Sequence, residues 1–348
     1  LHNGRHSFPT RRSSDLVTPD RMLARRVAAE LRRWGIAADD SAGMPLAKAE
    51  AGALMGLILA AAQSGGAPVD LLAMLKHPCA ALGMERATML RLVRRLERRV
   101  LRPARVTGGF AEMRARLGET GADGTSRWGI GDEERRAIGE VLTAAEDALA
   151  PLVALGRGAH GMERLTAAHA AALERLTRQA ESGRAAIWRG ADGEAGFALM
   201  QALAEAAEGG VALTLADYAI TFDGAARSVA VRPQGPRHAR VAIWGPLEAR
   251  MQSADLMILG GLNEGVWPQN PSDDPWLTRQ MRATLKLSQP ERRIGLSAHD
   301  FATMAAQPDV LLTRARRQDG APSNASRFLL RLRSEEHTSE LQSPTIIS

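Results

Sequence analysis

The sequence predicts an α/β protein in which a parallel sheet domain is interrupted by a long helical block. Short apolar runs that end at glycine, such as Leu256–Leu259 before Gly260, are typical of buried parallel strands. Between about residues 46 and 209 the apolar spacing is instead that of amphipathic helices. Strand-like runs return after residue 210, so we expect the two outer stretches to form one sheet domain.

The first outer stretch, residues 16–45, is expected to be a strand–helix–strand unit. A strand ends near Thr18, and Asp20 is placed to cap a helix that stops at Gly35. Residues 36–42 then form a short strand and turn. A unit of this length suits a parallel sheet.

The block 46–209 is expected to be all-helical, except for a glycine-rich stretch over residues 107–131 that is expected to be a loop with one short helix. Apolar residues at helical spacing predict helices over residues 54–61, 68–75, 85–102, 132–152, 162–180 and 194–207. The histidines in this block, His77, His160 and His169, have no partner ligands nearby in the sequence, so we expect structural roles for them.

The predicted helix over residues 85–102 carries an unusual number of arginines. Its apolar face is formed by Leu90, Val93, Leu96, Val100 and Leu101, and the rest is crowded by Arg91, Arg94, Arg95, Arg98, Arg99 and Arg102. Two interpretations stay open. The arginines form a solvated face, or they contact a phosphate backbone.

The second outer stretch, residues 210–333, predicts a return to the sheet domain. Residues 211–222 alternate like a strand or a helix–strand junction, and residues 238–244, 256–259 and 309–313 are expected to be strands. Helices are predicted over residues 277–285, 291–306 and 326–332. In open α/β sheets ligands bind beyond the carboxyl ends of strands, which is where Asn263 and Glu264 lie.

Both ends of the sequence lack periodicity. Residues 1–15, LHNGRHSFPTRRSSD, and residues 334–348, SEEHTSELQSPTIIS, resemble translated sequencing-adapter read-through. We therefore expect both to be disordered tails outside the fold, and the natural protein to be cut at both ends.

The composition excludes several classes of protein. No apolar run approaches the roughly 20 residues needed to cross a bilayer, so no membrane association is expected. The single cysteine, Cys79, excludes internal disulfides and a cysteine-based metal cluster, and it fits a reducing cytoplasm. We expect Cys79 to be a small buried hydrophobic residue and not a nucleophile.

The basic residues are almost all arginines, and the formal net charge is +6. Arginine suits phosphate contact, although a GC-rich coding bias explains the same excess. The only lysines are Lys48, Lys76 and Lys286. None follows a glycine, so a P-loop is absent. None has an acidic residue two positions earlier, so a nuclease site of the Asp…Glu-x-Lys type is absent too.

Several residues in the second outer stretch are candidates for binding. Glu264 either has a functional role or accepts hydrogen bonds from loop amides. Trp267 and Trp276 stack on bases or pack against the sheet. His299-Asp300 is expected to be a packing pair and not an acid–base pair. The candidates for DNA contact are Arg292, Arg293, Arg314, Arg316, Arg317 and Trp267.

The stretch GPLEARMQSADLMILGGLNEGVWP, residues 245–268, resembles the late motifs of the second RecA-like domain of superfamily 1 helicases. More closely, it resembles the AddB family, the second subunits of AddAB helicase-nucleases. The resemblance covers residues 16–333, and its helicase-like motif residues are Glu248, Arg250, Asn263, Glu264, Gly265 and Pro268.

This resemblance implies a RecA-like parallel sheet domain with a large all-helical insertion. It implies a cytoplasmic protein that acts with an AddA-like subunit on single-stranded DNA and duplex ends, in double-strand break repair by homologous recombination. ATP, Mg²⁺ and a 4Fe-4S cluster are implied for other domains of the parent complex.

Departures from the helicase pattern predict that this portion is not catalytic. The stretch Gly245–Glu248 lacks the lysine of the active pattern, and residues 297–301 hold no arginine where one is expected. Arg314, in Thr313-Arg314-Ala315, matches the expected letters but follows a strand. We expect a degenerate helicase domain that guides DNA; the alternatives are a non-catalytic helical scaffold and an active ATP-dependent helicase domain.

Overall fold

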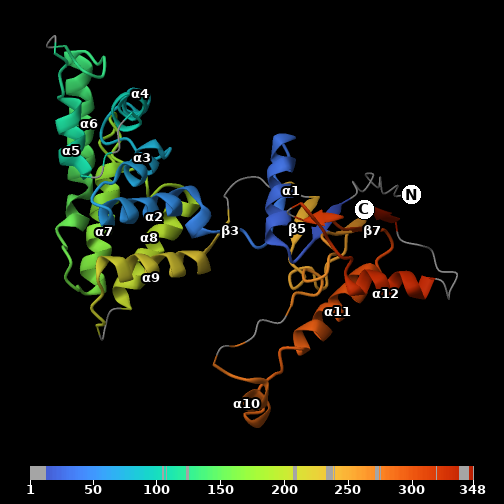
Figure 1. The fold of residues 1–348 in the computed structure, drawn as a ribbon. Helices are drawn as coiled ribbons and strands as arrows, with labels where there is room; N and C mark the ends of the chain where they lie inside the picture. Colours follow the sequence, from blue (N-terminus) through green and yellow to red (C-terminus); the bar gives the residue numbers. More distant parts are fainter. Residues whose placement is uncertain are drawn as a thin grey trace, which may run out of the picture. The chain divides into compact units, whose positions relative to one another are not determined.

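The computed structural model describes residues 13–347, except 104–105, 107, 123–124, 207–209, 233–237, 239, 271–273, 275, 319 and 337–344. The chain divides into two compact units (Figure 1). The sheet unit is built from two separate stretches, residues 1–42 and 235–348, and the helical unit comprises residues 43–234. None of the described helices is long and apolar enough to cross a membrane.

The sheet unit contains a six-stranded parallel sheet with the strand order β10-β7-β6-β1-β5-β2. The strands are β1 (Ser14–Val17), β2 (Asp39–Asp40), β5 (Val241–Trp244), β6 (Leu256–Leu259), β7 (Val310–Thr313) and β10 (Thr345–Ile347). In the central strand β1, Leu16 pairs with Ile243 on one side and Ile258 on the other. The predicted α/β class with a parallel sheet is therefore confirmed.

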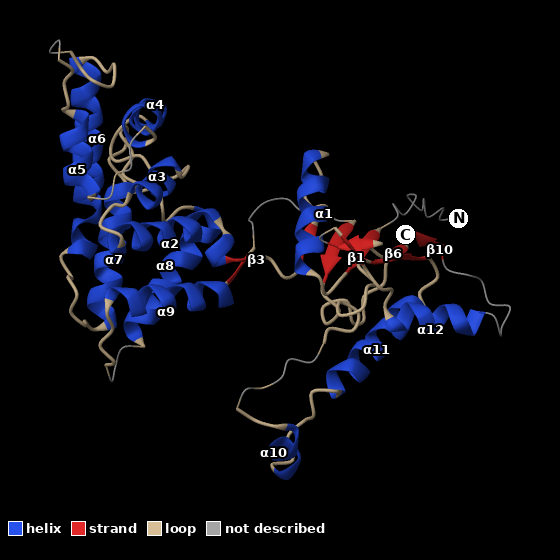
Figure 2. Ribbon diagram, in the orientation of Figure 1, coloured by secondary structure: helices blue, strands red, loops and turns tan. Residues whose placement is uncertain are grey.

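Helices pack on both faces of this sheet (Figure 2). Leu16 packs with Ala24 of a helix on one face, whereas its neighbour Val17 shares a cluster with Phe301 and Leu329 on the other. Successive strand residues point to opposite faces, so a strand covered on both sides is apolar throughout. The helices of this unit are α1 (Arg21–Arg33), α10 (Arg279–Thr284), α11 (Arg292–Ala305) and α12 (Arg327–Glu336), with a ribbon of β8 (Arg317–Gln318) and β9 (Ala321–Pro322).

The predicted ends of the first helix agree with α1. The Asp20 carboxylate accepts hydrogen bonds from the backbone N–H groups of Met22 and Leu23, at 2.8 and 3.1 Å. After the helix, Gly35 adopts a φ of +74°, which favours glycine.

The helical unit is organised around α2 (Glu50–Gln63), which buries residues on most of its circumference. Such a helix needs neighbours on several sides. These are α3 (Pro68–Lys76), α6 (Asp132–Val153), α7 (Met162–Leu176), α8 (Gly190–Glu205) and α9 (Leu215–Ser228). Two further helices pack against α6: α4 (Arg86–Leu96), which continues into the π-helical η2 (Glu97–Leu101), and α5 (Gly109–Leu117). The strands β3 (Met44–Pro45) and β4 (Ala230–Val231) pair beside a short 3₁₀ helix, η1 (Leu46–Lys48).

The structure differs from the sequence interpretation at residues 211–222, where a strand or a helix–strand junction was expected. The segment begins α9, which Thr214 caps by accepting the Asp217 N–H at 3.2 Å. Tyr218, Phe222 and Ala226 face the core at four-residue intervals, which is a helical period. The helical unit therefore extends beyond residue 209 to residue 234.

The expectation of disordered tails is wrong for the tail residues that belong to regular structure. Ser14 and Asp15 lie in β1, α12 continues through Glu336, and Thr345–Ile347 pair with β7. Backbone hydrogen bonds do not require apolar side chains, so these elements can form without an apolar periodicity in the sequence. Residues 1–12, 337–344 and 348 lie outside the described part of the chain.

His169 is a fully buried member of the helical core, in agreement with the structural role expected for it. Its Nδ1 lies 3.0 Å from the Tyr218 hydroxyl, and its Nε2 lies 3.0 Å from the Met55 carbonyl oxygen. The carbonyl can only accept, so a neutral ring donates from Nε2 and accepts from Tyr218 at Nδ1. Burial lowers the pKa of His169 to about 3.

This histidine makes the helical unit sensitive to acid. The folded-state pKa is lowered from 6.5 to about 3, so between these values the unfolded chain binds a proton that the folded chain does not. Stability therefore falls as the pH drops below 6.5, by up to about 1.4 kcal/mol per pH unit from this group. Chemical denaturation of the wild type and His169→Gln from pH 7 to pH 4 measures this. Equal pH slopes in the two proteins would contradict it.

Candidate functional site at the carboxyl edge of the sheet

The carboxyl end of β6 leads into a loop that passes very close to β1 and α1. A β-carbon at Gly260 would lie 2.7 Å from Leu16 Cδ1, and Gly261 has a φ of +74°. A side chain at position 260 would therefore require Leu16 to shift, and the backbone conformation at position 261 favours glycine. The pair delivers the next residues, Asn263 and Glu264, to the edge where ligands bind in open α/β sheets.

Asn263 is 3% exposed and holds three segments of the chain together. Its Nδ2 donates to the carbonyl oxygen of Ala315 at 2.7 Å, to Ser323 Oγ at 2.9 Å and to the carbonyl oxygen of Asn324 at 3.3 Å. Its Oδ1 accepts the Ala315 N–H at 2.9 Å. The whole carboxamide is thereby used inside the protein.

Glu264 is engaged by Arg327, the first residue of α12. The carboxylate accepts the backbone N–H of Arg327 at 3.0 Å and its Nε at 2.9 Å, and it also pairs with Nη2. These hydrogen bonds lower the pKa of Glu264. Of the two roles considered for Glu264, the structure supports the one in which it binds a backbone amide. The next residue, Gly265, has a φ of +82°, which lets the loop turn.

Trp267 does not stack on bases in this structure, which corrects its place among the DNA-contact candidates. The side chain is fully buried, its Nε1 donates to the carbonyl oxygen of Gly260 at 3.1 Å, and its ring lies edge-on to Phe301 at 6.2 Å between centroids. Pro268, which follows it, is buried as well. The burial of Trp267 was hard to predict from the sequence, because the loop residues that follow it are polar. Trp276, by contrast, is 85% exposed.

Arg250 and Asp300 form a two-point ion pair between the turn after β5 and helix α11. Arg250 Nε and Nη2 donate to the two carboxylate oxygens of Asp300 at 2.8 and 3.1 Å, and Asp300 is 7% exposed. This confirms a packing role for Asp300. Glu248 is exposed in the same turn. A cavity of about 270 Å³ lies beside the ion pair, between the turn and α11.

The arginine candidates occupy two segments of the sheet unit. Arg292 and Arg293 are exposed in the first turn of α11, and Arg316 and Arg317 are exposed just after β7. Arg314 is half-buried, and its Nη1 lies 3.5 Å from the Ser323 carbonyl oxygen. Because α11 ends shortly before β7 begins, its first turn lies toward the carboxyl edge of the sheet, where the Arg314–Arg317 segment also lies.

Sequence reasoning missed the residues that complete this edge. Arg327 and Ser323 lie about 60 positions from their partners Glu264 and Asn263. No local spacing signals such contacts, because the fold alone brings the segments together. A second missed pair is Arg21 with Asp40, at 2.6 Å, which joins the residues following β1 to the end of β2.

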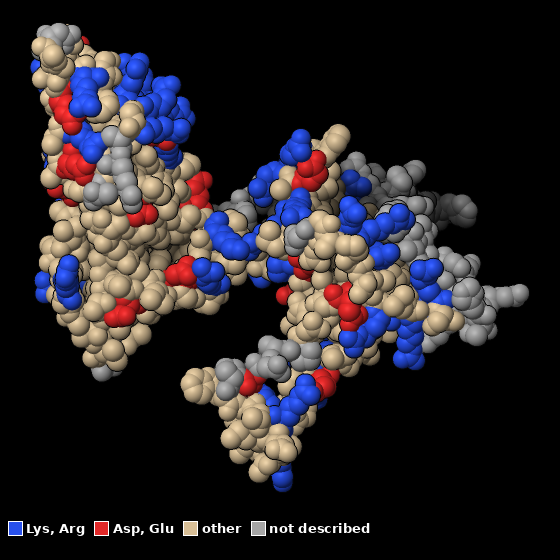
Figure 3. Space-filling view, viewed as in Figure 1, with Lys and Arg blue, Asp and Glu red and all other residues tan. Residues whose placement is uncertain are grey.

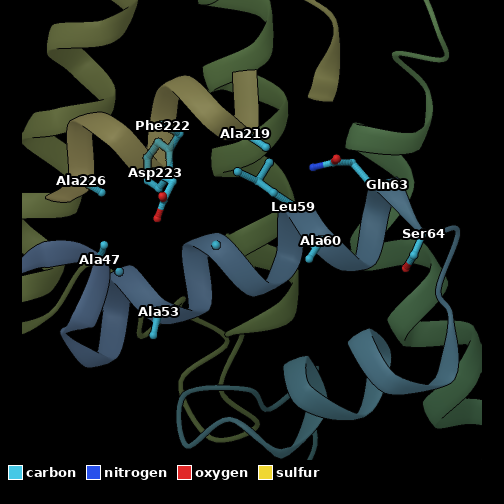
Figure 4. Close-up of a pocket in the computed structure, with 12 residues that line it drawn as sticks. Ala47, Ala53, Leu59, Ala60, Gln63, Ser64, Ala219, Phe222, Asp223 and Ala226 are labelled. Carbon is cyan, nitrogen blue, oxygen red and sulfur yellow. The ribbon is translucent and has the colours of Figure 1, made fainter. Parts of the chain in front are cut away.

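The helical unit has a cavity of about 590 Å³ between α2 and α9 (Figure 4). Its lining is mostly alanine and glycine, and its carboxylate, Asp223, pairs with Arg227 at 2.7 Å. The half-buried Cys79 thiol donates to Glu50 Oε1 at 3.3 Å, and burial raises its pKa to about 12, which disfavours the thiolate. Among the described residues, no group of His, Cys, Asp or Glu side chains is arranged to hold a metal ion.

Comparison with known proteins assigns no family to this fold. No family model matches the chain, and no curated protein matches it. The function is therefore inferred from the residues at the carboxyl edge of the sheet and from the motif resemblance.

The Asn263 network makes a specific prediction about stability. Asn263→Ala leaves the N–H of Ala315 without its partner and removes the side-chain donor to the carbonyl oxygens of Ala315 and Asn324, so we expect a loss of about 3 kcal/mol in the free energy of unfolding. Asn263→Asp is expected to cost more, because a carboxylate cannot donate to the carbonyl oxygens it would face. Urea unfolding measures both variants, with the exposed Asn270→Ala as the control. An Asn263→Ala loss no larger than that of the control would contradict the prediction.

Proposed function

We propose that this chain is a degenerate helicase domain of an AddB-like subunit, which guides DNA in the repair of double-strand breaks by homologous recombination. One observation carries the proposal. The GGLNEGVWP segment, residues 260–268, follows a core strand of a parallel sheet, and its polar residues organise the carboxyl edge. In the sequence, the two stretches that build the sheet unit come before and after the helical unit. This order is consistent with a RecA-like second domain that carries an insertion.

The same geometry favours a non-catalytic role. Asn263 and Glu264, the polar residues of the motif, are occupied by contacts with Ala315, Ser323 and Arg327. The residues present do not fit the cofactors of the parent complex, because no lysine follows a glycine and one cysteine cannot ligate a 4Fe-4S cluster. ATP, Mg²⁺ and the cluster would therefore be held elsewhere in the complex.

DNA binding is proposed for the exposed arginines near the carboxyl edge. Arg292 and Arg293 lie in the first turn of α11 with no carboxylate ion pair among the described residues, and Arg317 lies in the β8–β9 ribbon. Guanidinium groups bind phosphates in two-point fashion and stay charged at any physiological pH. Contacts of this kind are independent of base sequence.

Salt-dependent binding of single-stranded DNA tests this role. With about four phosphate contacts, the affinity is expected to fall about 50-fold between 50 and 200 mM salt. Fluorescence anisotropy of a labelled oligonucleotide measures it, with Arg292→Gln/Arg293→Gln expected to show a shallower salt dependence. No binding by the wild type at 50 mM salt would leave the helical scaffold as the better interpretation. Magnesium-dependent ATPase activity would overturn the non-catalytic role.

Contact with an AddA-like subunit is proposed for the segment around α10. Trp276, Met281 and Leu285 are 85, 51 and 59% exposed, and α10 buries none of its residues. Asp274 nevertheless orders the segment, by accepting the Trp276 N–H at 2.9 Å and pairing with Arg282 at 2.6 Å. Exposed aromatic and apolar side chains on a preorganised segment are typical of protein interfaces.

Removal of the aromatic anchor tests this contact. Trp276→Ala is expected to weaken association with an AddA-like subunit by about 2 kcal/mol, or roughly 30-fold in Kd, which is the cost of truncating an interface hot spot. Ile220→Ala, at a 74% exposed position of α9, is the control. Surface plasmon resonance with the purified partner measures both. Equal Kd values for Trp276→Ala and the wild type would rule out this segment as the interface.

A further inference from the structure

The helical unit carries a strongly basic surface along α4 and η2. Seven arginines and two glutamates lie between Glu85 and Arg102. Figure 3 shows basic side chains gathered over α4. Five of these arginines are exposed, and one of them, Arg102, pairs with Glu97. The other four, Arg91, Arg94, Arg98 and Arg99, are spaced mostly by three or four residues, which places them along one side of the helix. These four residues are called the α4 arginine surface below.

Neighbouring acidic residues neutralise little of this surface, because Glu85 caps α4 through the N–H groups of Ala87 and Thr88. Some arginines elsewhere in the helical unit pair with carboxylates on the same helix, as Arg116 does with Glu112 and Arg227 with Asp223. Glu97, within the basic segment, forms ion pairs with Lys76 at 2.5 Å and with Arg102 at 3.0 Å. In the described part of the chain, none of the four arginines of the surface forms an ion pair with a carboxylate.

The positive charge of this surface affects a neighbouring arginine of the same helix, Arg86. Burial, and after it the positive charge of Arg94, lowers the pKa of Arg86. Arg86 itself has a structural role, because its Nη2 donates to the carbonyl oxygens of Lys76 and His77, both at 2.9 Å. Like charges four residues apart, as in Arg94 and Arg98, also destabilise a helix. Repulsion of this kind is relieved when an anion binds.

A rigid base supports the α4 arginine surface. The opposite side of the helix is anchored in the core by Met89, Leu92, Val93, Leu96 and Val100, each at most 6% exposed. Arg95, next to the surface, is fixed by Glu134 at 3.2 Å and by the carbonyl oxygen of Gly129 at 3.2 Å. The helix backbone that presents the four guanidinium groups is therefore held in place before any ligand binds, which reduces the entropic cost of binding.

The surface suits a polyphosphate backbone better than a protein partner. Large exposed apolar side chains are absent from α4 and η2, whereas the core of a protein interface is apolar and depleted of charge. These elements also contain no aromatic residue, whereas proteins that bind single strands use aromatic side chains for base stacking. At about 1.5 Å per residue, Arg91 and Arg98 lie about 10 Å apart along the axis, a distance that spans about three phosphates of one duplex strand.

We propose that the α4 arginine surface binds the sugar-phosphate backbone of duplex DNA without reading its sequence. This site belongs to the helical unit and is distinct from the DNA-contact arginines proposed in the sheet unit. The proposal rests on the proposed role in DNA guidance. Each arginine that contacts a phosphate releases a counterion, so the surface adds to the salt dependence of duplex binding.

Binding of a labelled 25-base-pair duplex between 50 and 200 mM salt tests the proposal. The variant Arg94→Gln/Arg98→Gln/Arg99→Gln removes three positive charges and keeps good helix formers in α4. The slope of log K against log salt is expected to become shallower by about 2.7 if all three contact phosphates. The control, Arg157→Gln/Arg164→Gln/Arg189→Gln, makes the same charge change at exposed positions of the same unit and is expected to shift the slope far less. Circular dichroism melting confirms that each variant folds.

The outcomes separate this proposal from the proposed function. If the wild type binds single-stranded DNA in the anisotropy experiment above and the α4 variant binds duplex like the control, the α4 surface is refuted and the sheet arginines stand. If the wild type binds neither form of DNA, both fail. If poly-glutamate displaces the duplex as well as an equally charged unlabelled duplex does, the surface recognises carboxylates, and an acidic protein is its partner instead.

Discussion

The buried carboxamide of Asn263 is the interaction on which the carboxyl edge of the sheet depends. An amide side chain donates and accepts at once, so Asn263 can satisfy both the N–H and the carbonyl of Ala315 while it reaches Ser323 and Asn324. The contact joins the loop after β6 to the segment after β7 and to the residues before α12. A carboxylate or an aliphatic side chain of the same size would leave buried polar groups without partners.

This internal use of polar side chains determines where the protein can bind ligands. Glu264 accepts the first amide of α12, Asp300 pairs with Arg250, and Trp267 fills the core. These residues thus maintain the shape of the edge. Among the residues that the structure describes, arginines without a carboxylate ion pair lie outside this network, on α4 in the helical unit and at the start of α11 in the sheet unit. Such charge favours binding of a polyanion.

The two units are stabilised in different ways. The sheet unit buries Leu16 and Val17 of β1 against helices on opposite faces, so this end of the strand is apolar on both sides. The helical unit surrounds α2, which is apolar on most of its circumference. It tolerates a fully buried imidazole, His169, because the Met55 carbonyl and the Tyr218 hydroxyl satisfy both ring nitrogens.

The sequence by itself determined the α/β class, the cap of α1 at Asp20 and the position of Asn263 at a strand end, because these depend on local period and on residues a few positions apart. It misjudged α9, where a short alternating run concealed a helical face, and Trp267, whose burial is set by the distant Phe301 and Phe328 cluster. Only the tertiary structure decided what Asn263 and Glu264 do. Their partners lie about 60 residues away, and a contact at that separation is created by the fold and not by any local pattern.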